Sequence, residues 1–254
     1  MNWSKHFFVI SYNGFGFHGW QNQKDGNSVQ EVIEKTLSNI LKKQTIIFGC
    51  GRTDAGVHAD NYVFHATIPE NYDTLKFRLN KQLPDQIAVK QIVPVSKKAH
   101  AQKDATERIY TYYLHREKDA ALSTFSSWYP GLSLNLELLN LACRKIETAN
   151  DFYNFCLSPD KHYSTICNIR KVEIFQKDNR VAIRFFGDHY LKSMIRLLVG
   201  ELLRVSEGKT SLSDFEAYLN NTLQKPKHHK AHPQGLHLSY VQYPFFKAVI
   251  EKPF

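Results

Sequence analysis

The sequence has few of the residue patterns that mark metal and redox sites. It contains four cysteines in 254 residues, and no two of them form a C-x-x-C pair. A zinc knuckle, a dithiol redox site and a disulfide framework are therefore not predicted, and free buried thiols are the simplest interpretation. The H-E-x-x-H motif of zinc hydrolases is also missing, and we predict no metal site.

Long apolar runs and phosphate-binding loops are missing as well. The apolar run near the N-terminus starts at Phe7 and ends by Ser11, which is too short for a signal sequence or a membrane-spanning helix. We therefore expect a cytoplasmic protein that makes no membrane contact. No G-x-x-x-x-G-K-[ST] motif occurs. The stretch GFGFHG, residues 14–19, has the G-x-G-x-x-G spacing, but no helix is expected to open on its glycines, so nucleotide cofactors are not indicated.

Positive charge and aromatic side chains are abundant by comparison. Lysine and arginine outnumber aspartate and glutamate by 33 to 24, which gives a formal net charge of +9. The basic residues form no long block and are interspersed with 13 tyrosines and 17 phenylalanines. This distribution favours a folded surface that binds nucleic acid, although a solvated basic face without a partner has the same composition.

The first 95 residues predict the element order strand, helix, strand, strand, helix, strand. The expected strands are Phe7–Tyr12, Thr45–Phe48, Asn61–Ile68 and Ile87–Val95, and the expected helices are Ser28–Leu41 and Asp73–Leu83. Ser28 and Glu31 form a capping box at the start of the first helix. This order is the split βαβ pattern of the ferredoxin-like fold, which RNA-binding domains share.

The rest of the chain repeats that plan. The expected elements are a strand at Ile109–His115, a helix at Leu134–Glu147, a hairpin at Asn168–Gly187, a long helix over residues 190–208, a helix capped by Ser213 and Glu216, and a strand at Leu236–Tyr243. The polar segment 98–106 joins the two halves. We predict an α+β protein with an N-terminal half, residues 1–103, and a C-terminal half, residues 104–254.

The stretch GCGRTDAGVHAD, residues 49–60, concentrates polar side chains between two predicted strands. Arg52, Thr53, Asp54 and His58 lie among three glycines, which let another backbone or a ligand approach closely. The alternative is an ordinary Gly-rich turn with a surface ion pair. Cys50 is a candidate nucleophile near a cation, and a strand-end residue that packs inward is the simpler interpretation.

Two further polar residues are not needed by the folding pattern. Tyr110 begins an apolar strand, and Arg196 lies roughly 140° around its predicted helix from the apolar residue Leu191. Their alternatives are a half-buried strand aromatic and a solvated helix arginine. The run KHHKAHPQ, residues 227–234, has three histidines but no neighbouring cysteine or carboxylate, which favours a solvated or RNA-facing loop over a metal site.

Several of these blocks resemble, in order, those of the TruA family of tRNA pseudouridine synthases. The similar stretches are YNGFGFHGWQNQ, SVQEVIE, GRTDAGVHA, LNKQLPDQIAV, ATERIYTYYLH, NDFYNF, GDHYLKSMIRLLVGELLRVSEG and HPQGLHLSYVQY. They cover almost the whole chain, and their order makes the resemblance very specific.

The resemblance implies a fold and an isomerase activity. The fold would be two RNP-like halves that form one central mixed, mainly antiparallel sheet, with helices on one face and the active-site cleft between the halves. Members are homodimers that convert uridine to pseudouridine in the anticodon stem-loop of tRNA without a cofactor.

The resemblance also assigns roles to single residues. Asp54 becomes the catalytic aspartate and Arg196 its basic partner. Arg52 would help to open the RNA stack, and Tyr110 would lie against the target base. His58 from the same motif is our further candidate for substrate binding.

The chain departs from the family pattern at residues 99–102. They read AHAQ where the family usually has Phe-His-Ala-Arg. This difference leaves a second hypothesis open, a catalytically silent RNA-binding or RNA-folding factor on the same scaffold. A cysteine-dependent enzyme that uses Cys50 is a third hypothesis.

Overall fold

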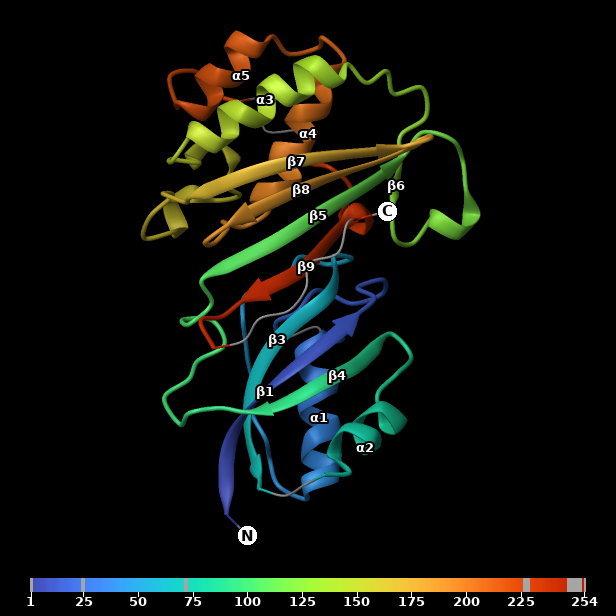
Figure 1. The fold of residues 1–254 in the computed structure, drawn as a ribbon, viewed down its shortest axis with the longest axis vertical. Helices are drawn as coiled ribbons and strands as arrows, with labels where there is room; N and C mark the ends of the chain where they lie inside the picture. Colours follow the sequence, from blue (N-terminus) through green and yellow to red (C-terminus); the bar gives the residue numbers. More distant parts are fainter. Residues whose placement is uncertain (1, 24–25, 71–72, 226–228, 246–252, 254) are drawn as a thin grey trace. The chain divides into compact units, whose positions relative to one another are not determined.

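The computed structural model describes residues 2–23, 26–70, 73–225, 229–245 and 253 (Figure 1). The chain divides into two compact units. The first unit comprises Met1–Thr106 and His237–Val249, and the second comprises Glu107–Leu236 and Ile250–Phe254. The first division falls three residues after the predicted boundary at 103. The predicted C-terminal half differs further, because residues 237–245 group with the first unit.

The first unit has the predicted ferredoxin-like order of elements. It contains β1 (Trp3–Tyr12), α1 (Val29–Leu41), β2 (Phe48–Gly49), β3 (His58–Pro69), α2 (Leu75–Gln82) and β4 (Ile87–Pro94), to which β9 (Leu236–Gln242) is added. Strand β1 lies between β3 and β4 and is antiparallel to both. Strand β2 pairs antiparallel with β3, and β9 pairs parallel with the start of β3.

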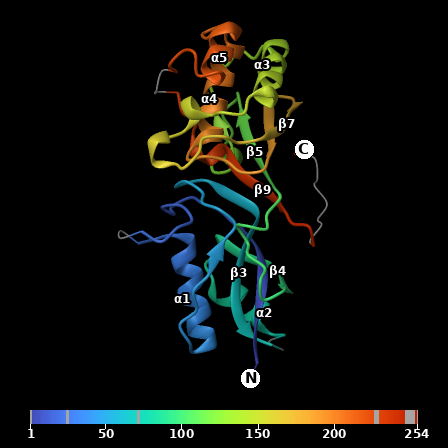
Figure 2. The same ribbon diagram turned by 90° about the vertical axis from the view of Figure 1, so that its left-hand side faces the viewer.

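Helix α1 forms as its sequence predicts. The Ser28 side chain accepts a hydrogen bond from the backbone N–H of Glu31, which satisfies one of the donors left open at a helix start. The helix buries Ile33 and Leu37 on its apolar face, and it lies beside β3 and β4 in the view of Figure 2. Within the sheet, the rings of Phe8 and Phe64 stack with their centroids 4.6 Å apart. The face of the first unit's sheet that α1 covers is thus its core face.

The predicted strand at Thr45–Phe48 is wrong over most of its length. Only Phe48 belongs to a strand, the two-residue β2. Side chains of α1 bind the preceding backbone instead: Ser38 Oγ accepts from the N–H of Thr45 at 2.9 Å, and Glu34 Oε1 accepts from the N–H of Ile47 at 3.0 Å. Because these donors are satisfied by the helix, the segment needs no strand partner there.

The second unit is also a sheet with accompanying helices. It contains β5 (Glu107–His115), β6 (Ser127–Trp128), α3 (Leu136–Thr148), β7 (Ile169–Lys177), β8 (Arg180–Gly187), α4 (Met194–Ser206) and α5 (Leu212–Leu219). Strand β8 lies between β5 and β7, antiparallel to both, and β6 pairs parallel with β5. Both units therefore confirm the α+β class with mixed, mainly antiparallel strand pairing.

Two helix starts in the second unit differ from the prediction. Helix α4 begins at Met194 and not at residue 190, because Ser193 has a left-handed backbone with φ 58°. Helix α5 is capped by Ser211, which accepts from the N–H of Asp214, and not by Ser213. The hairpin prediction is confirmed: β7 and β8 turn at Asp178, where φ is 55°. Among the described residues, no helix has the length and apolar character to cross a membrane.

Candidate active site

Asp54 lies in the aspartate loop, which we define as residues 50–57 between β2 and β3. The Asp54 carbonyl accepts a hydrogen bond from the N–H of Val57 at 3.2 Å, and Gly56 takes the left-handed φ of 76° that this turn requires. Asp54 is half-buried and Arg52 is exposed. The turn therefore presents a carboxylate and a guanidinium on neighbouring positions of one loop.

Hydroxyl groups and backbone contacts hold the residues on either side of Asp54. The hydroxyls of Tyr12 and Thr53 share a buried hydrogen bond of 2.8 Å. The Tyr62 hydroxyl donates to the Gly51 carbonyl at 2.6 Å, and the N–H of Trp20 donates to the Thr53 carbonyl at 3.2 Å. These contacts fix the backbone of the aspartate loop against strands β1 and β3.

A second loop packs directly on the aspartate loop. In this glycine loop, residues 13–20, a Cβ added to Gly19 would lie 2.5 Å from the Thr53 carbonyl oxygen, and one added to Gly14 would lie 2.1 Å from that of Val57. Only glycine permits backbones to approach so closely. In the sequence the two loops belong to separate motifs. In the structure they pack against each other and form one layer.

His58, at the start of β3, contributes to the same layer. Its Nδ1 accepts a hydrogen bond from the N–H of Gly14 at 3.1 Å, and its ring stacks on that of His237 with centroids 4.7 Å apart. His237 in turn places Nδ1 3.2 Å from Asp60 Oδ1. The buried His58 ring thus joins the glycine loop to β9, and its role in substrate binding stays a prediction.

Tyr110 lies in β5 of the second unit, opposite Phe185 of β8. Its side chain is buried and not half-buried as in the strand-aromatic alternative, and its ring packs edge to face with that of Tyr190 at a centroid distance of 5.3 Å and an interplanar angle of 84°. Edge-to-face contacts of this kind favour a defined relative orientation of two rings.

Arg196 is buried in α4 and is not the solvated helix arginine of the alternative interpretation. Its Nε donates to the Ala231 carbonyl at 2.8 Å, and the N–H of Ala231 donates back to the Arg196 carbonyl at 2.9 Å. Leu191, the predicted start of the apolar stripe, precedes the helix. A reciprocal pair of hydrogen bonds therefore fixes the guanidinium stem to the segment before β9.

Two tyrosines close to Arg196 escape prediction from the sequence. The Tyr112 hydroxyl donates to Ser127 Oγ at 2.9 Å and lies 3.0 Å from the Tyr129 hydroxyl. Burial raises the pKa of Tyr112 well above its ordinary value and also raises that of Tyr129, so both stay neutral. One feature of the sequence could have identified Tyr112. It lies two residues after Tyr110, and alternate residues of a strand lie on the same face.

The remaining sequence candidates occupy structural positions. The Cys50 side chain is fully buried, and its N–H bonds to the Val63 carbonyl at 2.8 Å, which agrees with a strand-end residue that packs inward. In the KHHKAHPQ run, Lys227 and His228 lie outside the described residues. His229 accepts a hydrogen bond from Arg204 at 3.2 Å, and the His232 ring lies 5.7 Å from that of Tyr129.

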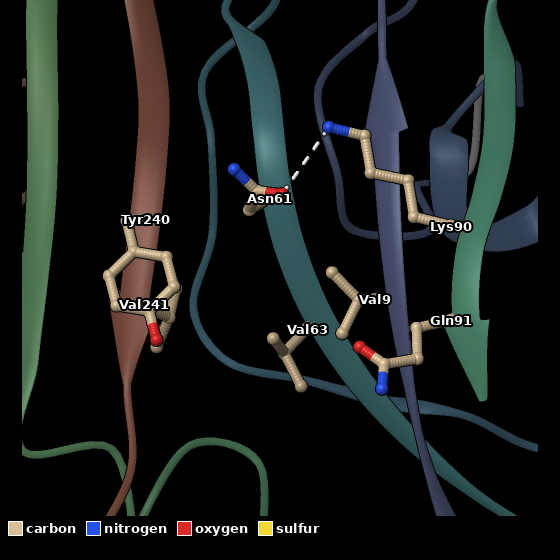
Figure 3. A pocket seen from close by; sticks show the side chains of 7 residues that line it. All are labelled: Val9, Asn61, Val63, Lys90, Gln91, Tyr240 and Val241. Atoms are coloured by element: carbon tan, nitrogen blue, oxygen red, sulfur yellow. Dashed lines mark hydrogen bonds between the residues drawn. The ribbon is translucent and has the colours of Figure 1, made fainter. Parts of the chain in front are cut away.

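A shallow pocket of about 170 Å³ lies on the first unit's sheet (Figure 3). Its lining comprises Val9, Asn61, Val63, Lys90, Gln91, Tyr240 and Val241. Lys90 Nζ reaches over to Asn61 Oδ1 at 3.3 Å, and the Asn61 amide donates to the Ser239 carbonyl at 2.9 Å. Lys90 and Asn61 of the lining thus bond to each other, and the lining includes none of the predicted site residues.

The structure therefore groups the predicted site residues in two sets. Asp54, Arg52 and His58 belong to the first unit, and Tyr110 and Arg196 belong to the second. In each set the side chains or their loops are held by hydrogen bonds and close packing. Such fixed geometry is what an active site requires.

Comparison with known proteins identifies relatives over nearly the whole chain. Residues 142–244 match the family model described as tRNA pseudouridine synthase. The tRNA pseudouridine synthase A of Parabacteroides distasonis is 36% identical over 214 residues, which cover 83% of this chain and 84% of that protein. The enzyme of the same name from Bacteroides fragilis is 34% identical over 251 residues, covering 96% and 98%. That from Azobacteroides pseudotrichonymphae is 33% identical over 245 residues, covering 95% and 97%. The chain belongs to the tRNA pseudouridine synthase A family.

Proposed function

We propose that this protein is an isomerase that converts uridine to pseudouridine in the anticodon stem-loop of tRNA, with Asp54 as the catalytic residue. The observation that carries this proposal is the Asp54 carboxylate, half-buried on a turn whose flanking residues are fixed by Tyr12 and Trp20. The membership in the family supports it independently.

The reaction explains why a carboxylate is needed. Formation of pseudouridine breaks the bond between C1′ of the ribose and N1 of the base and makes a bond from C1′ to C5, so no atom is gained and no electron carrier takes part. An ionised carboxylate serves either as a nucleophile or as a base at the sugar. Both roles need Asp54 to be charged and held in place.

The other site residues have complementary roles in the proposal. Arg196 is the basic partner of the Asp54 carboxylate, because an unpaired charge is costly where water is excluded. Tyr110 lies against the flipped base, and Arg52 helps to open the RNA stack. Extrusion of a stacked base costs a few kcal/mol, which contacts to such side chains offset. The proposal therefore assigns roles in one reaction to both sets of residues.

The substrate is the part of the proposal that composition supports. A net charge of +9 favours association with a polyanion such as tRNA. The anticodon stem-loop as target, the homodimer and the cytoplasmic location follow from the family resemblance, and they stay predictions for this chain.

The decisive experiment compares Asp54→Asn with the wild type on a tRNA transcript. We expect loss of pseudouridine formation by roughly three orders of magnitude or more, because asparagine can neither attack the sugar nor accept a proton there. Binding of the tRNA, measured by filter retention, should change by less than about threefold, since the shape of the side chain is kept. Pseudouridine is located by base-specific chemical mapping.

A matched control is available in the same unit. Asp60→Asn removes a carboxylate six residues further along the chain, one that faces His237, and it should leave the activity intact. Full activity of Asp54→Asn would contradict the proposal. Binding of tRNA without any conversion by the wild type would instead support the silent RNA-binding factor.

A further inference from the structure

The loop between β8 and α4, residues 188–193, is attached to strand β5 at two points. Arg108 Nη1 donates to the Asp188 carbonyl at 2.6 Å, and the Tyr190 hydroxyl donates to the Arg108 carbonyl at 3.2 Å. Arg108 is itself buried and lies two residues before Tyr110. The loop is therefore bonded to the segment of β5 from which the Tyr110 side chain projects.

The position of the Tyr190 ring within this loop is closely defined. A Cβ added to Gly187 would lie 2.8 Å from the Tyr190 hydroxyl and 3.0 Å from the Asn168 carbonyl oxygen, so the ring occupies the space above a glycine. Burial, together with the nearby Tyr110, raises the pKa of Tyr190 well above its ordinary value. The hydroxyl is thus a neutral donor to β5 at any physiological pH.

The loop also has little freedom at its two ends. Asp188 Oδ1 accepts hydrogen bonds from the N–H groups of Asn168 and His189, at 3.1 Å and 2.6 Å. At the other end, the left-handed Ser193 leads directly into α4, which carries Arg196. Tyr190 therefore lies in a short loop that is hydrogen-bonded to β5, the strand of Tyr110, and that leads into α4, the helix of Arg196.

We infer that Tyr190 is a positioning residue for the isomerisation, which fixes the plane of the Tyr110 ring against the target uridine. The inference rests on the proposed function and adds a residue to it. The rings of Tyr190 and Tyr110 meet edge to face at an interplanar angle of 84°, so a tilt of the Tyr110 ring toward Tyr190 is blocked. A misplaced Tyr110 would slow the reaction more than it would weaken tRNA binding, because reaction rates depend steeply on alignment.

The first test removes the ring. Tyr190→Leu should lower the single-turnover rate by about tenfold or more, with the tRNA dissociation constant within about threefold of the wild type. Tyr190→Phe keeps the ring edge and loses only the bond to Arg108, and it should retain at least about a third of the rate. Tyr218→Leu is the control: it removes another buried tyrosine of the second unit, from α5, and should lower the melting temperature without this loss of rate.

The second test separates positioning from general loss of structure. If Tyr190 acts through Tyr110, Tyr190→Leu should cause the same loss of rate in a Tyr110→Phe background, which keeps the ring, and almost none in a Tyr110→Leu background. Equal losses in both backgrounds, or an undiminished rate in Tyr190→Leu, would overturn the inference while the proposed function stands. A wild type that forms no pseudouridine would overturn both.

Discussion

The aspartate loop of the first unit and the Tyr110–Arg196 set of the second unit are held by different means. Around Asp54 the contacts run to the backbone: the carbonyls of Gly51 and Thr53 accept hydrogen bonds, and a glycine packs where any side chain would collide. Tyr110 and Arg196 are instead held through their own side chains: the Tyr110 ring packs against Tyr190, and the Arg196 guanidinium bonds to Ala231.

This difference predicts which kinds of substitution should disturb each set of residues. A short side chain such as that of aspartate has few rotamers, so a fixed backbone largely fixes its carboxylate. Long side chains such as those of tyrosine and arginine stay mobile on a fixed backbone unless something contacts them. Substitutions in the first unit should therefore act through the backbone, and those in the second through neighbouring side chains.

The largest effect beyond Asp54 itself is expected at Gly19. Gly19→Ala places a methyl group 2.5 Å from the Thr53 carbonyl, which must move together with Asp54 beside it. We expect the rate of pseudouridine formation to fall on the order of a hundredfold, as displacement of a reacting group by about 1 Å can cause. Single-turnover kinetics on tRNA measure the effect.

Gly16 provides the matched control for this substitution. It has a left-handed φ of 80°, similar to the 91° of Gly19, but a Cβ there would have no atom within 4 Å. Gly16→Ala should therefore show the strain of the backbone alone, about 1 kcal/mol of stability, and should keep the activity. An equal loss of rate in both variants would mean that the collision with the Thr53 carbonyl is not the cause of the lost activity.

A smaller effect is expected at Arg196. Arg196→Lys keeps the charge but loses the Nε hydrogen bond to Ala231, so the cation is no longer held, and the rate should fall by roughly tenfold. Arg196→Met, which removes the charge, should fall further. Activity assays of the two variants, with melting temperatures as a check on folding, test this order. A rate for the lysine variant as low as that for methionine would show that the charge contributes nothing beyond the hydrogen bond, and would contradict this order.

The smallest effect is expected from Tyr12→Phe. This change removes one hydroxyl bond to Thr53, and the Trp20 backbone and the Tyr62 hydroxyl still hold the loop. We expect a loss of about 1 kcal/mol in the free energy of unfolding and a change of rate below about threefold. Urea denaturation and the tRNA assay measure both quantities. A loss of activity as large as that of Gly19→Ala would contradict the view that backbone contacts dominate in this unit.

Capping residues and apolar periodicity in the sequence predicted much of the fold. They failed where side chains, and not the backbone of a neighbouring strand, accept the hydrogen bonds of a segment. The Ser28 cap and the apolar stripe that follows gave helix α1 with its first and last residues. Thr45 and Ile47 have strand composition, but Ser38 and Glu34 of α1 bind their N–H groups. Propensity describes what a segment prefers alone, and here a neighbouring helix supplied the partners instead.

The sequence by itself determined the family. Asp54 lies in a contiguous motif, and the spacing and order of such motifs along the chain were enough to indicate the family and to single out Asp54 as the catalytic candidate. Only the tertiary structure decided how the companions are held, because their contacts join residues far apart in the chain, such as Tyr110 with Tyr190 and Arg196 with Ala231. Such pairs have no fixed sequence spacing, since they arise from the packing of strands, helices and loops that are distant from each other in the chain.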